Sequence, residues 1–189
     1  MVGEKTVRLA TRRRILIGHT GTRVELSVFC PRDLQSTNVD VCRRCPRRVG
    51  IEDHSVTCVP EVAPLRGGSL VGAVMGDASV TIEAATPVGA LTDLVQSGGW
   101  MAVVVLDTDD RALGLIEREQ LTSVEPGTVA RVLARPLAPV LESSPVMSVV
   151  RRMVHERARV FPVESSAGST VGVVTDLDAL RWVAALGNK

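Results

Sequence analysis

Hydrophobic and polar positions follow the same order twice between residues 71 and 186. Each copy begins with a short extended segment, at 80–82 or 138–141, and continues with apolar residues at helical spacing. Two nearly continuous apolar runs then predict strands packed against helices, and a further helix closes the copy. The strand runs are 103–106 and 113–116 in the first copy and 160–163 and 171–174 in the second. The pattern therefore predicts two β-α-β-β-α units.

The two copies align without a gap, because Pro145 follows Pro87 by 58 residues and Gly172 follows Gly114 at the same distance. Thr86 and Ser144 precede these prolines, which predicts a hydroxyl N-cap followed by proline in the first helical turn. The predicted helices carry their apolar faces on Val88, Leu91, Leu94 and Val95, and on Val146, Val149, Val150 and Met153. Such self-similarity indicates two copies of one supersecondary unit.

The N-terminal part differs in composition and charge. Residues 1–66 carry 12 basic and 7 acidic side chains, whereas residues 67–189 carry 10 basic and 14 acidic ones. Alternating residues 23–29 and 55–59 predict strands, and 61–70 reads as a linker. We expect an α+β protein with three parts: a small β-rich domain over 1–66, a first repeat over 67–128 and a second over 129–189. The two repeats form a pseudo-two-fold module.

All four cysteines fall within the N-terminal part, at Cys30, Cys42, Cys45 and Cys58. No apolar signal segment precedes them, so we expect a cytoplasmic chain with reduced thiols, which favours a metal site over disulfides. Cys42 and Cys45 share a C-x-x-C turn, and the flanking cysteines complete a tetrahedral zinc shell like that of a zinc ribbon. Alternatives are His54 in place of one thiolate, an iron–sulfur cluster, or no metal.

The second repeat carries a motif that identifies a family. Residues 172–180 read Gly, two valines, Thr175, two residues, Asp178, which resembles the motif of the cystathionine-β-synthase (CBS) domain pair, or Bateman module. Val160-Phe161-Pro162-Val163 resembles the central strand of that family, and the segment from Val71 to Met75 resembles its first segment. The resemblance covers the two repeats and excludes the cysteine-bearing part.

The resemblance implies a sensor that binds an adenosine-containing ligand, such as AMP, ATP or S-adenosylmethionine, between the repeats. Thr175 and Asp178 lie three residues apart at a helix start, so the carboxylate suits ribose hydroxyls, and the hydroxyl and helix amides suit phosphate. The other implied ligand-binding residues are Val140 and Leu141 beside adenine, Phe161 and Val174 as apolar walls, and Arg159 against phosphate. The same Thr-x-x-Asp spacing also describes a helix capping box.

The first repeat departs from the motif at both polar positions. Glu117 replaces the threonine and Gln120 replaces the aspartate. Because a carboxylate at the phosphate position repels an anionic ligand, we expect at most one nucleotide site, in the second repeat.

Composition and motifs restrict the remaining functions. The chain has 189 residues, 45% of them hydrophobic and 2% aromatic, with a formal net charge of +1 and no apolar run of membrane-spanning length. No catalytic triad, HExxH, Walker or dinucleotide motif is present, so we expect a regulatory protein rather than an enzyme. The resemblance implies a homodimer formed through the CBS helices. The alternative is a zinc-ribbon adaptor for nucleic acid or protein, whose basic N-terminal arginines contact the partner while the CBS pair only dimerises.

Overall fold

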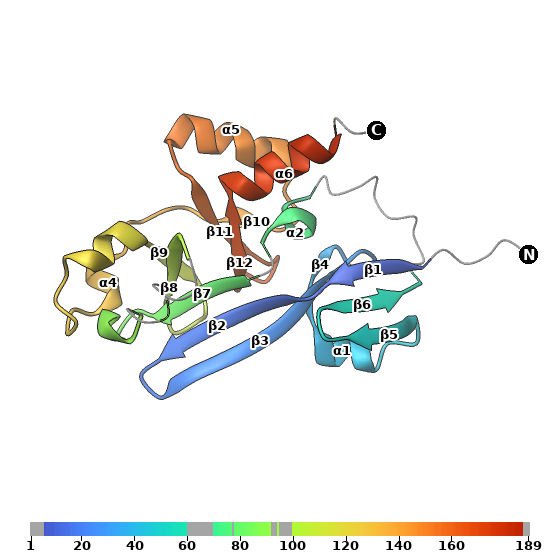
Figure 1. The fold of residues 1–189 in the computed structure, drawn as a ribbon, viewed down its shortest axis with the longest axis horizontal. Coiled ribbons are helices and arrows are strands. Elements are labelled where there is room, and N and C mark those ends of the chain that lie inside the picture. The colour runs from blue at the N-terminus through green and yellow to red at the C-terminus, as the bar shows by residue number, and fades with distance from the viewer. Residues whose placement is uncertain (1–5, 60–69, 77, 92–93, 95–99, 187–189) are drawn as a thin grey trace, which may run out of the picture.

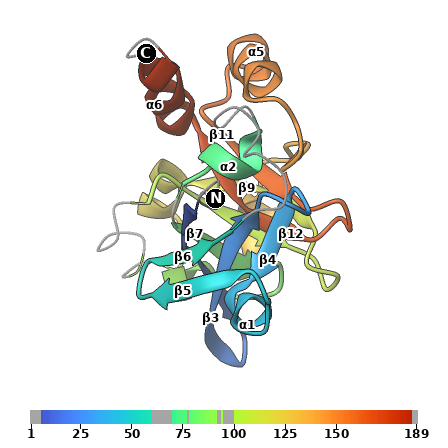
Figure 2. The same ribbon diagram turned by 90° about the vertical axis from the view of Figure 1, so that its right-hand side faces the viewer.

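The computed structural model describes residues 6–59, 70–76, 78–91, 94 and 100–186. Within these residues the strands form one six-stranded and two three-stranded sheets. Figure 1 shows the second repeat, with its two long helices, above the large sheet, and the cysteine-bearing part at one end of it. Figure 2 shows the same arrangement from the side of the cysteine-bearing part.

The six-stranded sheet joins the N-terminal part to the first repeat. Its order is β4-β3-β2-β7-β8-β9, and β2 pairs in parallel with β7 over Arg13–Ile17 and Ala78–Ile82. The strands are β2 (Arg12–Gly18), β3 (Gly21–Cys30), β4 (Gln35–Asn38), β7 (Ala78–Glu83), β8 (Ala102–Leu106) and β9 (Ala112–Glu117). The sheet therefore runs without a break between two regions that the sequence assigns to separate parts.

The second repeat has its own sheet with the same pairing order as β7-β8-β9. β10 (Val140–Leu141) pairs in parallel with β11 (Val160–Glu164), which pairs antiparallel with β12 (Thr170–Thr175). Helices α5 (Val146–Glu156) and α6 (Asp176–Leu186) pack against each other and against this repeat. The shorter helices are α2 (Val71–Val74), α4 (Ala130–Leu133), η1 (Val88–Leu91) and η2 (Arg118–Thr122).

The cysteine-bearing part contributes the third sheet, in the order β1-β6-β5. Its elements are β1 (Val7–Ala10), α1 (Val39–Arg43), β5 (Arg48–Glu52) and β6 (Ser55–Cys58). A small core of Val28, Val39 and Val56, with Leu9 and Cys42 against it, holds this sheet to α1 and to β3. Strands thus make up most of the described residues before residue 60.

The sequence located the strands of both repeats and helix α5 correctly, whereas both predicted hydroxyl N-caps were wrong. α5 begins at Val146 after Pro145, whose ψ of 135° is extended, and no side chain caps it. Ser144 is therefore not the N-cap, and the hydroxyl of Thr86 is buried without a hydrogen-bond partner. Where the sequence predicts the helix after Pro87, the structure describes the 3₁₀ helix Val88–Leu91. Val95 of that predicted helix lies outside the described residues, as does most of the 61–70 linker.

Strand β8 shows how the two repeats share a core. Val103 and Val105 face a cluster with Ile15 and Ile17 of β2. Val104 and Leu106 face the opposite side, where they meet Val160 and Val173 of the second repeat. Because alternate side chains of a strand point to opposite faces, both faces of this sheet are buried, which accounts for the continuous apolar run in the sequence.

Candidate functional site

The start of α6 brings Thr175 and Asp178 into direct contact. The Thr175 hydroxyl donates to Asp178 Oδ2 at 2.8 Å, and the Thr175 backbone N–H donates to the same oxygen at 2.9 Å. In return, the Asp178 N–H donates to Thr175 Oγ1 at 3.1 Å. This reciprocal pattern is a capping box, which satisfies backbone donors that the first helical turn leaves open.

Charged side chains surround this helix start. Asp176, the first residue of α6, accepts from Arg159 Nε at 2.8 Å, and its N–H donates to the Arg159 carbonyl. The hydrogen bond to Asp176 raises the pKa of Arg159. Arg181 lies 3.9 Å from the second oxygen of Asp178, whose side chain is buried. Two arginines thus lie within reach of an anion at the helix N-terminus, where the helix dipole also favours negative charge.

The apolar residues of the expected site lie in the core of the second repeat. Phe161 and Val174 are opposite each other in the β11–β12 ladder, and both belong to one buried cluster with Val140. The Arg152 guanidinium lies over the Phe161 ring, 4.5 Å from its centre. Leu141 is 49% exposed, so of these four residues it is the one that offers an apolar surface to a ligand.

The first repeat repeats the capping arrangement with other residues. The Glu117 N–H donates to Gln120 Oε1 at 2.7 Å, while Gln120 Nε2 donates to the Leu133 carbonyl. Arg135 pairs with Glu117 at 2.7 Å. Glu117 and Gln120 occupy the places of Thr175 and Asp178 and, like them, have partners within the protein; the difference is that a carboxylate, Glu117, stands where the second repeat has a hydroxyl. The two repeats also differ at the edge of their sheets. In the first repeat β2 pairs along β7, whereas β10, the counterpart of β7 in the second repeat, pairs among the described strands with β11 alone.

The CBS domain family model matches residues 129–185, which make up the second repeat. The structure of CBSX2 in complex with AMP has a TM-score of 0.57, with 19% sequence identity over 65% of this chain and 100% of that one. The fold is that of a CBS domain pair. No curated protein matches the sequence.

Other CBS pairs have the same fold at low identity. The cytosolic domain of the Mg²⁺ channel MgtE in complex with ATP has a TM-score of 0.55 and 22% identity over 60% of this chain. This chain spans about half of that domain, 48%. A CBS domain pair/ACT domain protein from Thermotoga maritima has a TM-score of 0.55 and 14% identity, over 62% of this chain and 98% of that one. These similarities establish the architecture of the two CBS repeats.

The four cysteines lie around one end of the cysteine-bearing part. Cys42 and Cys45 are joined by a turn in which the Cys45 N–H donates to the Cys42 carbonyl at 3.1 Å. Arg48, which follows Cys45 by three residues, pairs with Cys58 across the β5–β6 ladder. Burial raises the pKa of Cys42, and the charges of the three other cysteines raise it further. Among the described residues, however, no three His, Cys, Asp or Glu side chains form a group able to hold a metal ion.

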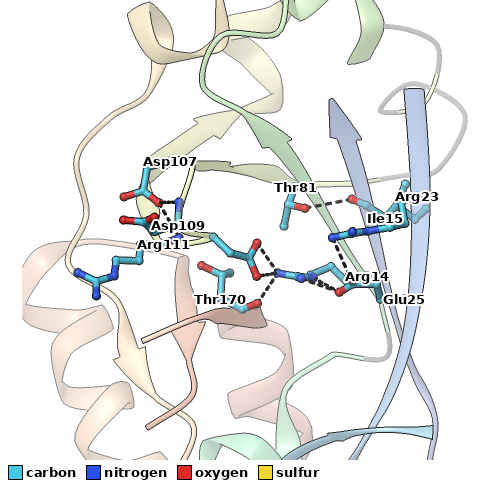
Figure 3. A network of polar contacts seen from close by, with 10 residues as sticks. Arg14, Ile15, Arg23, Glu25, Thr81, Asp107, Asp109, Arg111 and Thr170 are labelled. Atoms are coloured by element: carbon cyan, nitrogen blue, oxygen red, sulfur yellow. Dashed lines mark hydrogen bonds and ion pairs between the residues drawn. The ribbon is translucent and has the colours of Figure 1, made fainter. Parts of the chain in front are cut away.

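Sequence reasoning missed a polar junction that ties the N-terminal part to both repeats (Figure 3). Arg14, on β2, bonds Glu25 of β3, the carboxylate of Asp110 at 2.9 Å and the carbonyl of Thr170. Its side chain is 11% exposed, and these carboxylates raise its pKa against the opposing effect of burial. Three consecutive arginines gave no indication that two of them, Arg12 and Arg14, are largely shielded from solvent.

A second missed residue is Glu142, which directly follows β10. It is 1% exposed, and its Oε2 accepts from the Ser36 N–H of β4 at 2.7 Å. Burial raises its pKa, while the Ser36 hydrogen bond and the charge of Arg12 oppose that shift. A cavity of about 150 Å³ between Arg14, Ser36 and Thr170 lies at the same junction.

Among the described residues, no helix has both the length and the hydrophobicity needed to span a bilayer.

Proposed function

We propose that the protein is a regulatory protein, not an enzyme, that binds one adenosine-containing ligand of the AMP, ATP or S-adenosylmethionine class at its second CBS repeat. The observation that supports this most is the asymmetry between the two helix starts. Thr175 and Asp178 lie at an N-terminus flanked by Arg159 and Arg181. In the first repeat a carboxylate, Glu117, takes that place and is paired with Arg135.

The proposed contacts follow from the chemistry of each group. Asp178 accepts hydrogen bonds from the ribose hydroxyls, and the Thr175 hydroxyl exchanges its bond to Asp178 Oδ2 for one to phosphate at the N-terminus of α6. When the ligand binds, the Arg159 guanidinium gives up part of its contact with the Asp176 carboxylate and contacts the phosphate instead. Leu141 covers adenine from the exposed side, while Val140, Phe161 and Val174 support that wall from the core. Solved structures with this fold hold AMP in CBSX2 and ATP in MgtE.

The matched capping boxes provide a control for the test. Asp178→Ala and Gln120→Ala each remove a capping side chain, so each lowers the free energy of unfolding by about 1 kcal/mol. Only Asp178→Ala should abolish binding of AMP, ADP, ATP or S-adenosylmethionine in calorimetry. A true ligand at 100 times its Kd adds about 2.7 kcal/mol of stability in a thermal-shift assay.

Two results would contradict the proposal. Equal loss of binding in both variants would point to general destabilisation. Absence of any shift with the four adenosyl compounds would favour the alternative, in which the CBS pair only dimerises an adaptor for nucleic acid or protein.

We further propose that Cys30, Cys42, Cys45 and Cys58 bind one zinc ion. The support is geometric: Cys42 and Cys45 share one tight turn, and Cys58 lies on the neighbouring strand opposite Arg48, in a module whose buried core is small. Thiolates repel one another until a cation joins them, so a metal ion itself draws such ligands together. Protein purified without chelator should contain about one zinc per chain, and Cys42→Ser should lose it. If protein purified without chelator contains no metal and its four thiols titrate freely, the site is refuted.

The homodimer also remains a proposal. α5 and α6 expose apolar side chains, among them Val154, which is 76% exposed, and Leu180, which is 64% exposed. Pairing of these helices between two copies would bury that surface. Light scattering should give twice the chain mass, and Leu180→Glu should give the monomer. A cytoplasmic location stays a prediction.

A further inference from the structure

Strand β10, which carries the residues expected beside adenine, is held mainly from its two ends. It has two residues, Val140 and Leu141, and among the described strands it pairs only with β11. At its N-terminal side, Arg152 donates to the carbonyls of Ala138 and Pro139. Because so short an edge strand has few ladder bonds, its position depends on these anchors.

The anchor at the C-terminal end of β10 belongs to a different part of the chain. The Glu142 N–H donates to the Glu164 carbonyl at 2.9 Å, and the Glu142 carbonyl accepts from the Gly72 N–H at 2.8 Å. Its carboxylate turns toward β4, where it accepts from the Ser36 N–H. A buried carboxylate is costly without such partners, so this contact fixes the end of β10 to β4 of the N-terminal part.

A second strand of the expected site is anchored to the same part. β12 starts at Thr170, whose carbonyl accepts from Arg14 and whose N–H donates to the Asp110 carbonyl at 2.9 Å. Thr170 begins the six-residue strand that ends at Thr175, with a register shift opposite Val163 and Glu164. Figure 3 shows Arg14 reaching from β2 to Thr170. Two of the three strands that carry expected ligand contacts, β10 and β12, are thus tied to β4 and β2.

We propose that Glu142 and Arg14 are positioning residues for the nucleotide site of the second repeat, so that the N-terminal part sets the affinity of that site. They act through β10 and β12 and touch no ligand themselves. This inference rests on the proposed function, since it assumes that the second repeat binds an adenosine-containing ligand. Coupling of binding free energies is reciprocal, so ligand binding must also stabilise the Glu142–Ser36 contact.

Calorimetry with AMP and ATP on the full chain tests the first half of the proposal. Glu142→Ala removes the acceptor for Ser36 and should weaken binding about tenfold, the effect expected for one buried hydrogen bond. Glu142→Gln keeps an acceptor oxygen and should stay within about twofold of the wild type. Arg14→Lys keeps the charge but loses the fork that joins Glu25, Asp110 and Thr170, and should weaken binding about fivefold.

A matched control lies in the same N-terminal part. Arg8 bonds Glu52 and Ser55 without touching either repeat, so Arg8→Ala should leave both nucleotide affinities unchanged. Unfolding without ligand is measured for every variant, which separates loss of affinity from loss of the fold.

Hydrogen exchange of the wild type tests the second half without any substitution. Saturating AMP or ATP should slow exchange of the Ser36 amide, and Glu142→Ala should remove that protection. Unchanged exchange at Ser36 with bound nucleotide would overturn the inference, as would a folded Glu142→Ala protein with wild-type affinity. A wild type that binds no adenosyl compound refutes instead the proposed function.

Discussion

Gly114 and Gly172 hold the same place in the two CBS repeats, yet alanine should affect them in opposite directions. A Cβ on Gly114 would collide with the backbone carbonyl of Arg135. At Gly172 the nearest atom to a Cβ would be the flexible Met75 side chain, with its sulfur at 3.4 Å, an ordinary contact. Neither glycine has a positive φ, so backbone strain plays no part.

The magnitude follows from the hydrogen bonds at each position. In the first repeat, Leu115 and Arg135 exchange two backbone hydrogen bonds, of 3.0 and 2.8 Å, beside Gly114. Forcing this bridge apart costs about 2–3 kcal/mol, whereas replacing glycine within a strand returns about 0.5–1 kcal/mol. Gly114→Ala should therefore lose about 2 kcal/mol, and Gly172→Ala should be neutral or gain up to about 1 kcal/mol.

Thermal and urea unfolding of the two variants measure this difference. For a chain of this size, Gly114→Ala should lower Tm by about 4–8 °C, while Gly172→Ala leaves it unchanged or raises it by up to about 4 °C. A Gly114→Ala protein as stable as Gly172→Ala would refute the close approach of the 135–136 segment to β9. Gly127→Ala is a second control, because a Cβ there would have open space around it.

Three further predictions concern the junction and the cysteines. A Cβ on Gly72 would collide with the Phe29 ring, so Gly72→Ala should lose about 1–2 kcal/mol in urea unfolding, and less in a Phe29→Leu background; equal losses in both backgrounds would argue against the contact. Burial raises the pKa of Glu142 above its ordinary value of 4.5, so the folded protein keeps this proton to higher pH than the unfolded chain, and its stabilising contribution is lost as pH rises through the folded pKa. The stability of the wild type relative to Glu142→Gln should accordingly fall as pH rises above 4.5, and a constant difference would contradict this. Burial also raises the pKa of Cys42 and Cys58, so in metal-free protein alkylation of both should be slow at pH 7 and accelerate as pH rises; fast reaction at pH 7 would show accessible thiolates.

Local signals were sufficient for most of the repeat architecture. The continuous apolar runs gave β8, β9, β11 and β12, because strands buried on both faces leave little room for polar residues. The Thr175–Asp178 spacing identified a helix start, and the structure places the two side chains in a capping box. The departure at Glu117 and Gln120 was also readable, since it depends on residue type at aligned positions.

Long-range pairing was beyond the sequence. Nothing local in Arg12–Gly18 indicates that it pairs with Ala78–Glu83, since alternation of apolar residues fixes which face is buried and not which strand lies alongside. The burial of Arg14 and Glu142 has the same origin, because their partners Thr170 and Ser36 are distant along the chain. The predicted start of the second-repeat helix was wrong by one residue, because the backbone at Pro145 is extended and the helix begins at Val146.

The sequence by itself determined the tandem repeat, the order of strands and helices within each copy and the inequality of the two motifs. These properties depend on periodicity and residue type, which act over a few neighbouring residues. The tertiary structure decided that the N-terminal strands continue the sheet of the first repeat and that Arg14 and Glu142 join them to the second. Those features depend on which surfaces meet, and that is set by the packing of the whole chain.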